Sequence, residues 1–260
     1  MSILDEFRLE GQTAVITGGN RGIGRSIANA YAELGANIVV ANRDEQVGEK
    51  AASEIADSYD VTTQQVSVDV SEEEQVRELS KTVVDEFGKI DILVNNAGVT
   101  NNTAAENLTL DEWNHVLDIN LTGTFLCSRH IGEQMIDGGG GGTIVNLSSI
   151  AAYIASNPQP QIAYHTSKGG VKQFTKQLAS EWAEYDIRVN AIAPGYIRTE
   201  MVDEVLRTDD ELASTWRSEM LQDEIMGPDC LKGAAVLLAS DAGRYMTGET
   251  IVVDGGYLAR

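Results

Sequence analysis

Tyr164 and Lys168 are residues whose types and spacing can do acid–base chemistry. They stand four positions apart, and on a helix this spacing places both side chains on one face. A free phenol titrates near pH ~10, and a neighbouring ammonium lowers that pKa, so the pair can serve as a general acid or base. The same spacing also occurs by chance on many helices. The prediction therefore requires a hydride carrier and a partner for the substrate oxygen elsewhere in the chain.

A glycine-rich stretch at residues 18–24 offers a site for such a carrier. It follows the β-branched run 13–17, which is typical of a buried parallel strand, and it precedes a helix with apolar periodicity. Between a strand and a helix, glycines let the backbone turn tightly and approach a pyrophosphate at the helix N-terminus. The stretch therefore predicts a dinucleotide site.

The second predicted strand, 37–41, is followed by Asn42 and Arg43. An acid at this point would bind the ribose hydroxyls of NAD, whereas a cation can meet the 2′-phosphate of NADP. Arg43, with Arg21 in the glycine turn, favours NADP(H) over NAD(H). The alternative is that Arg43 points into solvent and Asn42 binds the ribose.

Further strands and helices are predicted along the rest of the chain. The strands are expected at 63–68, 90–94, 143–147, 187–193 and 250–253. Ser71 with Glu74, and Thr109 with Glu112, each have the spacing of a helix capping box. The helix after Thr109 contains Asn120, which is disfavoured in a helix interior and can have a polar function.

Ser149 follows the strand at 143–147, and parallel strands carry ligands beyond their carboxyl ends. The charged segment 200–226 contains Trp216, Met220 and Met226, and we predict that it is a mobile helical insertion over the pocket.

The chain is strongly acidic. Forty Asp and Glu residues face 19 Lys and Arg residues, which gives a net charge of −21 and a pI of about 4.4. Such a surface repels nucleic acid and anionic lipid and argues against both as partners. Acidic runs at 44–45, 72–74 and 209–211 spread the charge along the chain, as in a protein kept soluble in concentrated salt. We expect a halophilic source, and the alternative is an acidic mesophilic enzyme.

Neither a membrane span nor a metal site is predicted. No apolar run approaches the ~20 residues of a membrane helix, and the N-terminus lacks the apolar core of a signal peptide. Cys127 and Cys230 lie in predicted helices outside any Cys-x-x-Cys motif, so we expect buried, reduced thiols. His115, His130 and His165 show no ligand spacing. We therefore expect a cytoplasmic protein.

The motifs together resemble the short-chain dehydrogenase/reductase family over nearly the whole chain. The matches are Thr17-Gly18-x-x-x-Gly22-x-Gly24, Asp69-Val70, Asn95-Asn96-Ala97-Gly98, Ser149, Tyr164-x-x-x-Lys168, Pro194-Gly195 and Asp254-Gly255-Gly256. The resemblance implies one α/β domain over residues 1–260, with a Rossmann fold. It also implies a doubly wound, seven-stranded parallel sheet with helices on both faces, an NAD(P) cofactor, and assembly as a homotetramer or dimer.

The resemblance also implies residue roles. Tyr164 would be the general acid/base, Lys168 would lower its pKa and bind the nicotinamide ribose, and Ser149 would bind the substrate oxygen. Asn120 would hold a water that links Lys168 to solvent. The cofactor would contact Gly18, Asn20, Arg21, Gly22, Ile23, Gly24, Asn42, Arg43, Asp69, Val70, Asn96, Ala97, Gly98, Tyr164, Lys168, Pro194, Gly195, Ile197 and Thr199.

The segment between Ser149 and Tyr164 is longer than in many members of the family and contains Asn-Pro-Gln-Pro-Gln at 157–161. In this it looks like the branch that acts on polyols, ketoses and sugar acids. Gln159, Gln161 and Tyr196, with Ser149, are candidate substrate contacts. The alternative is that the glutamines only cap the loop.

We therefore expect an oxidoreductase that interconverts a secondary alcohol and a ketone, on a sugar acid of the gluconate type or on a polyol or ketose. The runner-up is a 3-oxoacyl-[acyl-carrier-protein] reductase, which uses the same four catalytic residues. It would need a basic patch for its acidic carrier, and this composition is poor in cations. A catalytically silent nucleotide-binding scaffold is a third possibility, and the presence of all four catalytic residues argues against it.

Overall fold

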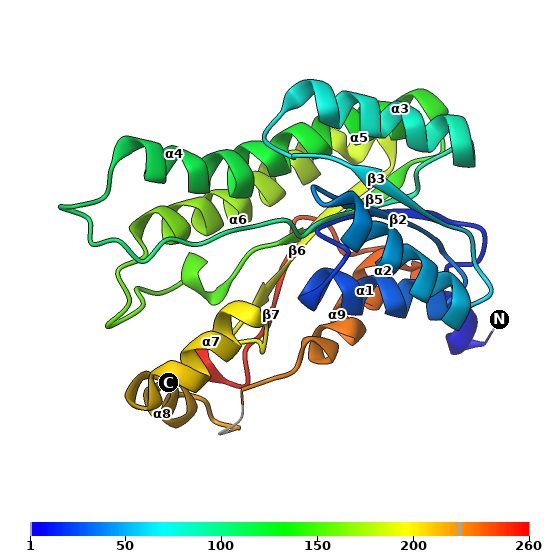
Figure 1. The fold of residues 1–260 in the computed structure, drawn as a ribbon. Coiled ribbons are helices and arrows are strands. Elements are labelled where there is room, and N and C mark those ends of the chain that lie inside the picture. Colours follow the sequence, from blue (N-terminus) through cyan, green and yellow to red (C-terminus); the bar gives the residue numbers. More distant parts are fainter. Residues whose placement is uncertain (1, 223–224, 260) are drawn as a thin grey trace.

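A seven-stranded parallel sheet forms the centre of the molecule in the computed structural model, which describes residues 2–222 and 225–259 (Figure 1). The strands are β1 Thr13–Thr17, β2 Asn37–Asn42, β3 Thr63–Ser67, β4 Ile92–Asn95, β5 Gly142–Leu147, β6 Ile187–Pro194 and β7 Thr250–Val253. Their order is β3-β2-β1-β4-β5-β6-β7, with every pair parallel. The predicted doubly wound α/β fold is confirmed. The chain changes direction across the sheet between β1 and β4, and ligands bind beyond the carboxyl ends of strands at such a point.

Helices cover both faces of the sheet. They are α1 Gly22–Glu33, α2 Glu45–Ser58, α3 Glu73–Phe87, α4 Leu110–Leu117, α5 Gly123–Gly138, α6 Ile162–Trp182, α7 Glu200–Thr208, α8 Asp210–Glu219 and α9 Lys232–Ala239. Figure 1 shows α1, α2 and α9 on one face and α3 to α6 on the other. Helices α7 and α8 lie beyond the sheet near the C-terminal residues. They form most of the predicted insertion 200–226, of which residues 223–224 lie outside the described part.

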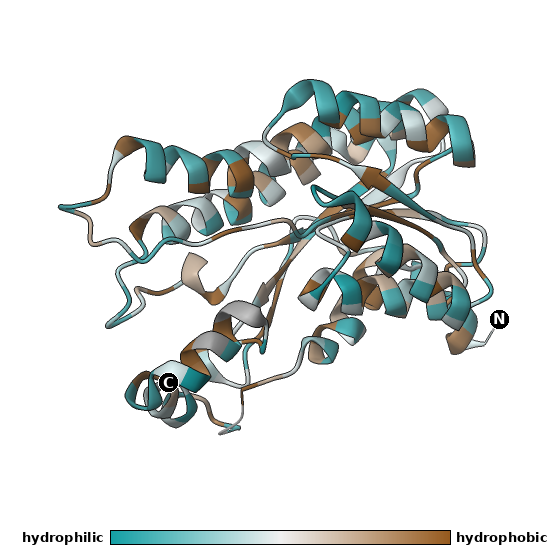
Figure 2. Cartoon of the chain, in the orientation of Figure 1, coloured by the Kyte–Doolittle hydropathy of each residue, from teal (hydrophilic) through white to brown (hydrophobic). Residues whose placement is uncertain are grey.

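Each buried strand contributes to two apolar cores. In β1, Ala14 and Ile16 pack with α1, α2 and α9, whereas Val15 packs with α3 and α5. Successive side chains of a strand point to opposite faces, so an unbroken apolar strand can serve both helix layers. Figure 2 shows hydrophobic residues along the sheet and hydrophilic residues on the outer helix faces.

Of the two predicted capping boxes, one is confirmed and one is wrong. Thr109 Oγ1 accepts from the Glu112 backbone N at 3.2 Å, and Glu112 Oε2 accepts from the Thr109 backbone N at 2.9 Å. At the start of α3, the Ser71 hydroxyl instead donates to Asp69 Oδ1 at 2.6 Å. Because this hydroxyl is engaged with the preceding turn, no box forms with Glu74.

The two cysteines differ from the prediction in one respect. Cys127 is buried in α5, as expected. Cys230 is exposed, because it lies in a short 3₁₀ turn, Pro228–Leu231, and not inside a longer helix. Within residues 2–222 and 225–259, no helix combines the length and apolar character that a membrane crossing requires.

Candidate active site

The glycine turn after β1 has a backbone shape that only glycine readily provides. Gly18 and Gly22 have φ angles of 65° and 54°, in the left-handed region. A Cβ on Gly24 would lie 2.4 Å from the Gly18 carbonyl oxygen. The Asn96 amide closes the turn by donating to the carbonyls of Thr17 and Gly18 at 2.8 and 3.2 Å. The backbone of this turn is therefore fixed at the start of α1.

The first turn of α1 is arranged to bind an anion. Arg21 occupies the N-cap position without making a side-chain cap, so a ligand can accept from the first-turn N–H groups. Asn20 and Ile23 are half-buried beside it, and Ile23 also packs on the core. These residues, and the tight backbone turn that Gly18, Gly22 and Gly24 allow, fit the pyrophosphate of a dinucleotide.

Polar groups at the end of β2 lie near those that follow β3. Asn42 is buried and donates to a backbone carbonyl two residues on at 2.6 Å. The Arg43 side chain is 65% exposed, and its guanidinium lies 3.8 Å from Asp69 Oδ2. Desolvation acts to raise the pKa of Asp69, but hydrogen bonds from Ser71 and the nearby Arg43 hold it below its ordinary value. The Arg43 guanidinium therefore lies beyond the carboxyl end of β2, where the adenosine end of a dinucleotide would lie.

The loop after β4 passes close to the glycine turn. The backbone N–H groups of Asn96 and Ala97 both donate to Thr17 Oγ1, at 2.9 and 3.0 Å. A Cβ on Gly98 would lie 3.6 Å from Lys168 Nζ, so Gly98 joins this loop to the catalytic pair. Val70, which follows β3, is buried against Gly123 of α5.

Helix α6 and the end of β5 bring the predicted acid–base residues together. Ser149 follows β5 and makes a side-chain hydrogen bond with Tyr164. Lys168 Nζ lies 5.7 Å from the centre of the Tyr164 ring and donates to the Leu147 carbonyl at 2.7 Å. A carbonyl or hydroxyl oxygen of a substrate could contact both the Ser149 hydroxyl and the Tyr164 phenol.

The pKa of Tyr164 shifts in the direction opposite to the prediction. Desolvation raises the pKa of the phenol, and the hydrogen bond with Ser149 offsets this only in part. Lys168 does not counter the desolvation, because its ammonium is turned toward the Leu147 carbonyl. Burial lowers the pKa of Lys168 itself to about 8. In this state Tyr164 retains its proton at neutral pH and is suited to act as an acid.

Asn120 lies in a π-helical turn, Asp118–Thr122, between α4 and α5. Its Oδ1 accepts from the Val99 N–H at 2.8 Å, and its Nδ2 donates to the Val99 carbonyl at 2.9 Å and to Ser167 Oγ at 3.0 Å. Ser167 in turn donates to the Tyr164 carbonyl at 2.7 Å. Asn120 therefore joins the loop after β4 to the catalytic helix, and its amide is occupied by protein groups.

The segment after β6 closes the site from the other side. Gly195 follows Pro194, and its N–H donates to the Val253 carbonyl at 2.9 Å. Ile197 is buried and pairs with Met226 in an isolated β-bridge. The Thr199 methyl lies 3.6 Å from the position of a Cβ on Gly22, so this segment reaches back to the glycine turn.

An aromatic group stands at the entrance to the site. The Tyr196 ring stacks on Trp216 with centroids 4.3 Å apart, and Tyr257 meets it edge-on at 5.6 Å. The Tyr196 hydroxyl lies 3.5 Å from Gln159 Oε1, whereas the Gln161 amide donates to Asn102 Oδ1 at 2.7 Å. Of the two predicted glutamines, only Gln159 therefore approaches Tyr196.

The sequence-based prediction did not include two residues beside this entrance. His165 follows Tyr164 on α6 and hydrogen-bonds to Ser156 in the preceding loop. The sequence could have indicated both residues, because a histidine directly follows the predicted acid–base residue and a serine lies in the lengthened segment.

Comparisons with known proteins identify the family. A family model described as enoyl-(acyl carrier protein) reductase matches residues 18–258. Galactitol 2-dehydrogenase of Rhizobium johnstonii is 40% identical over 259 residues, which cover 99% of each chain.

Two solved structures extend the match. A short-chain type dehydrogenase/reductase from Mycobacterium marinum superposes with a TM-score of 0.95 at 39% identity, covering all of both chains. A gluconate 5-dehydrogenase from Burkholderia cenocepacia, in complex with NADP and tartrate, superposes with a TM-score of 0.94 at 34% identity over the full length of both. The chain therefore belongs to the short-chain dehydrogenase/reductase family of NAD(P)-dependent oxidoreductases that act on CH–OH groups.

Proposed function

We propose that this enzyme interconverts a secondary alcohol and a ketone on a sugar acid of the gluconate type, or on a polyol or ketose. The observation that carries the proposal is the convergence of Ser149, Tyr164 and Lys168 next to the glycine turn. The names of the galactitol and gluconate dehydrogenases similar to this chain support the substrate class.

In the reduction direction, the substrate oxygen would accept hydrogen bonds from Ser149 and Tyr164. A nicotinamide, when bound, would supply the hydride, and Tyr164 would give its proton to the substrate oxygen. The raised pKa of Tyr164 keeps that proton available at neutral pH. The Ser149 hydroxyl stabilises the negative charge on the oxygen as it forms. We propose that Asn120 anchors, through its main-chain carbonyl, a water that links Lys168 to solvent, because its side-chain amide is bonded to Val99 and Ser167.

For the cofactor we propose a preference for NADP(H) over NAD(H). Arg43 stands at the end of β2 as an exposed cation, and a guanidinium binds a phosphate well. The similar gluconate 5-dehydrogenase structure contains NADP. The contacts proposed for the cofactor are those given above from the sequence.

For the substrate we propose contacts with Tyr196 and Gln159, which meet at the entrance to the site. A phenol and an amide can both donate to and accept from the hydroxyls of a sugar. Gln161 is bound to Asn102, so in this conformation it shapes the entrance by packing the loop.

We propose that α7 and α8, within residues 200–226, move as a cover over the substrate. Trp216, Met220 and Ile225 form a small core of their own, separate from the two main cores. The partly buried Tyr196 and Tyr257 pack against this core, so a shift of the cover would displace the entrance residues.

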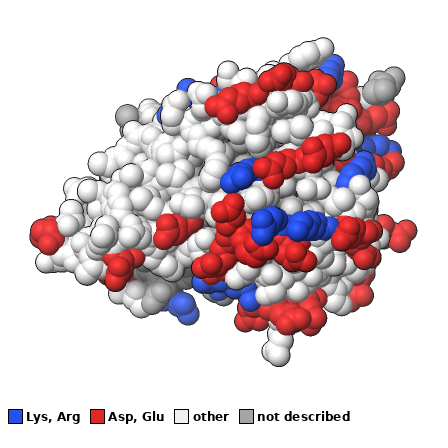
Figure 3. Space-filling view, turned by 90° about the horizontal axis from the view of Figure 1, so that it is seen from above, with Lys and Arg blue, Asp and Glu red and all other residues white. Residues whose placement is uncertain are grey.

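We also propose that the protein assembles as a homodimer or homotetramer in the cytoplasm of a halophile and acts in carbohydrate metabolism. Figure 3 shows charged residues crowded over one half of the face seen from above and sparse over the half toward α4. Several exposed apolar side chains lie in α4 to α6 or beside them: Leu110 in α4, Phe125 in α5, Ile162 in α6 and Tyr153 in the loop before α6. Light scattering after size-exclusion chromatography measures the assembly.

The test of the function uses NADPH and NADH in separate runs with keto sugar acids, ketoses, simple ketones and an acetoacetyl thioester. We expect turnover on a keto sugar acid or ketose. Tyr164→Phe should lower kcat by about 10²- to 10⁴-fold with NADPH binding retained, because it removes the proton donor. Tyr185→Phe, which alters a surface tyrosine, is the matched control.

Each other outcome has a definite meaning. A near-wild-type rate in Tyr164→Phe would end the proposed mechanism. Activity confined to the thioester would favour the 3-oxoacyl-[acyl-carrier-protein] reductase. NADPH binding without any turnover would favour a silent scaffold.

A further inference from the structure

A histidine beside the acid–base pair has no role in the mechanism above. His165 follows Tyr164 on α6, and the two rings lie edge to face with centroids 6.2 Å apart. The His165 side chain is half-buried, and its two ring nitrogens contact different parts of the loop at 153–161, which connects to the start of α6. The ring therefore ties this loop to the catalytic helix.

The partners of the ring determine which nitrogen carries the proton. Nδ1 lies 2.9 Å from the Gln161 carbonyl oxygen, which can only accept, so Nδ1 carries the hydrogen. Nε2 lies 3.1 Å from the Ser156 backbone N–H, which can only donate, so Nε2 presents its lone pair. The Ser156 hydroxyl lies 2.9 Å from the same nitrogen. This arrangement requires a neutral imidazole with its proton on Nδ1.

The loop held by His165 contacts the substrate entrance on two sides. On one side the Ser156 hydroxyl makes a hydrogen bond with Tyr196. On the other side the Gln161 amide donates to Asn102 Oδ1 at 2.7 Å, in the loop after β4. Because His165 contacts both Ser156 and Gln161, it connects the two sides of the entrance through a single ring.

We propose that His165 is a positioning residue for the substrate, whose neutral ring fixes the 153–161 loop and thereby sets the places of Tyr196 and Gln159. The proposal rests on the proposed function for the class of substrate, a hydroxylated ketone or alcohol. Among the residues proposed to contact the cofactor, Tyr164 meets the His165 ring edge-on, and the rest, apart from Lys168, belong to the glycine turn and to the segments after β2, β3, β4 and β6. Losing the tether should therefore weaken substrate binding and leave cofactor affinity unchanged.

Two substitutions separate the tether from the bulk of the ring. His165→Phe keeps an aromatic ring but can neither accept from Ser156 nor donate to Gln161. His165→Gln keeps a side-chain oxygen that can accept from the Ser156 N–H. Thr166→Ala is the matched control, because Thr166 is the next residue on α6, is exposed, and donates its hydroxyl to the Ile162 carbonyl within its own helix turn.

We expect His165→Phe to raise KM for the best keto sugar acid or ketose about tenfold, with kcat changed by less than about threefold and the NADPH Kd unchanged. His165→Gln should recover most of the loss in KM, and Thr166→Ala should match the wild type. A fall in kcat at constant KM would overturn the proposal, because it would mean that His165 acts through Tyr164. An unchanged KM in His165→Phe would overturn it as well.

A second readout does not depend on the substrate. Hydrogen exchange measured by mass spectrometry should be faster across 153–161 in His165→Phe and near wild type in His165→Gln, because the Ser156 N–H loses its acceptor only in the first. Unchanged exchange in His165→Phe would show that the tether does not exist. If the wild type turns over nothing in the panel, the proposed function fails, and the exchange experiment still decides on the tether.

Discussion

Lys168 is a buried cation whose ammonium bonds to a main-chain carbonyl in place of approaching the phenol. The four-residue spacing shows that Tyr164 and Lys168 share a helix face, but it does not determine the rotamer of a flexible lysine. The ammonium donates instead to the carbonyl of Leu147, which lies in β5, 21 residues earlier in the sequence. A buried ammonium near neutral pH destabilises the fold, and this cost depends on pH.

Lys168→Met should change the dependence of stability on pH. The pKa of Lys168 is about 8 in the folded state and near ~10.4 in the unfolded chain. Between these values the unfolded chain binds more protons, so the contribution of Lys168 to the free energy of unfolding rises with pH. Below about pH 8 the buried ammonium lowers the free energy of unfolding by its full amount, up to about 3 kcal/mol. Urea unfolding of both proteins from about pH 7 to about pH 10 should show wild type gaining relative to Lys168→Met. Lys176→Met, on the exposed face of α6, should show no such trend.

Arg43→Asp should shift cofactor preference toward NADH. The substitution removes the exposed cation at the end of β2 and adds a carboxylate that repels a 2′-phosphate and can accept from a ribose hydroxyl. The ratio of kcat/KM for NADPH to that for NADH should fall at least about tenfold. Lys50→Asp makes the same change in charge on exposed α2 and serves as the control. An equal effect of the two substitutions would mean that the cofactor preference depends on the overall electrostatic potential of the protein and not on Arg43.

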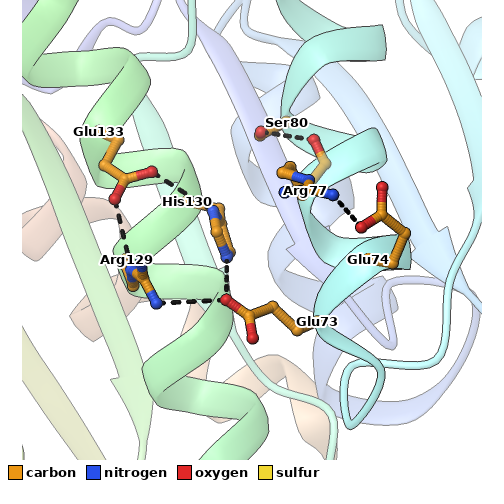
Figure 4. Close-up of polar contacts among 7 residues, drawn as sticks. All are labelled: Glu73, Glu74, Arg77, Ser80, Arg129, His130 and Glu133. Atoms are coloured by element: carbon orange, nitrogen blue, oxygen red, sulfur yellow. Dashed lines mark hydrogen bonds and ion pairs between the residues drawn. The ribbon is translucent and has the colours of Figure 1, made fainter.

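Among the elements, α3 and α5 are joined by an ionic cluster at their surface (Figure 4). Glu73 Oε1 accepts from Arg129 at 3.2 Å and lies 3.1 Å from His130 Nε2, and the other ring nitrogen of His130 lies 3.3 Å from Glu133. A protonated His130 can donate to both carboxylates at once. This cluster links two helices, whereas the ion pair between Glu74 and Arg77 stays within α3.

Glu73→Gln should destabilise the protein more than Glu74→Gln. Both substitutions remove one negative charge from the first turn of α3, so their effects on the helix dipole and on net charge cancel in the comparison. The remaining difference is the contacts of Glu73 to α5 less the ion pair of Glu74 with Arg77 inside α3, and for such exposed pairs we expect about 0.5–1 kcal/mol at low salt. Urea unfolding at low and molar KCl measures it, and the difference should shrink in the concentrated salt. Equal stabilities at low salt would show that the cluster adds nothing.

The acidic runs of the sequence have a second explanation in the structure, because each lies at a helix N-terminus. Asp44 caps α2 by accepting from the Val47 N–H, and Asp209 caps α8 by accepting from the Leu212 N–H. Glu73 and Glu74 lie in the first turn of α3. Acids at these places stabilise helices by capping or through the helix dipole in proteins from any source. The runs therefore do not by themselves indicate a halophile, and that proposal depends on the net charge of −21.

For the whole molecule, this net charge predicts a strong dependence of stability on salt. Self-repulsion of a −21 protein weakens as the Debye length falls from about 10 Å at ~0.1 M to about 3 Å at ~1 M salt. The Tm should rise by more than ~4 °C over this range of KCl, which corresponds to more than about 1 kcal/mol for a chain of this size. Scanning calorimetry in KCl, with sorbitol as a non-ionic control, tests this. A flat Tm would favour the acidic mesophile.

The sequence predicted those features that depend on backbone geometry. Strand periodicity and the glycine turn were sufficient to predict the parallel sheet. They also predicted that Ser149, Tyr164 and Arg43 lie beyond the carboxyl ends of its strands. The sequence did not predict side-chain directions that depend on distant partners. Gln161 turns to Asn102, the Asn120 amide is taken up by Val99 and Ser167, and His165 bonds to Ser156. Each of these pairings is fixed by tertiary contacts that a local pattern does not contain.

The strand order has a consequence during synthesis on the ribosome. β1 pairs with β2 on one side, but its other neighbour, β4, begins 75 residues after β1 ends. At about 5–20 residues per second, the inner edge of β1 stays without its partner for roughly 4–15 s as the nascent chain emerges. An unpaired apolar edge is prone to pair with another chain. We therefore expect chaperones to contact the first ninety or so residues during translation. At that stage the N-terminal half, which contains the glycine turn, cannot yet pack against the half that contains the catalytic helix.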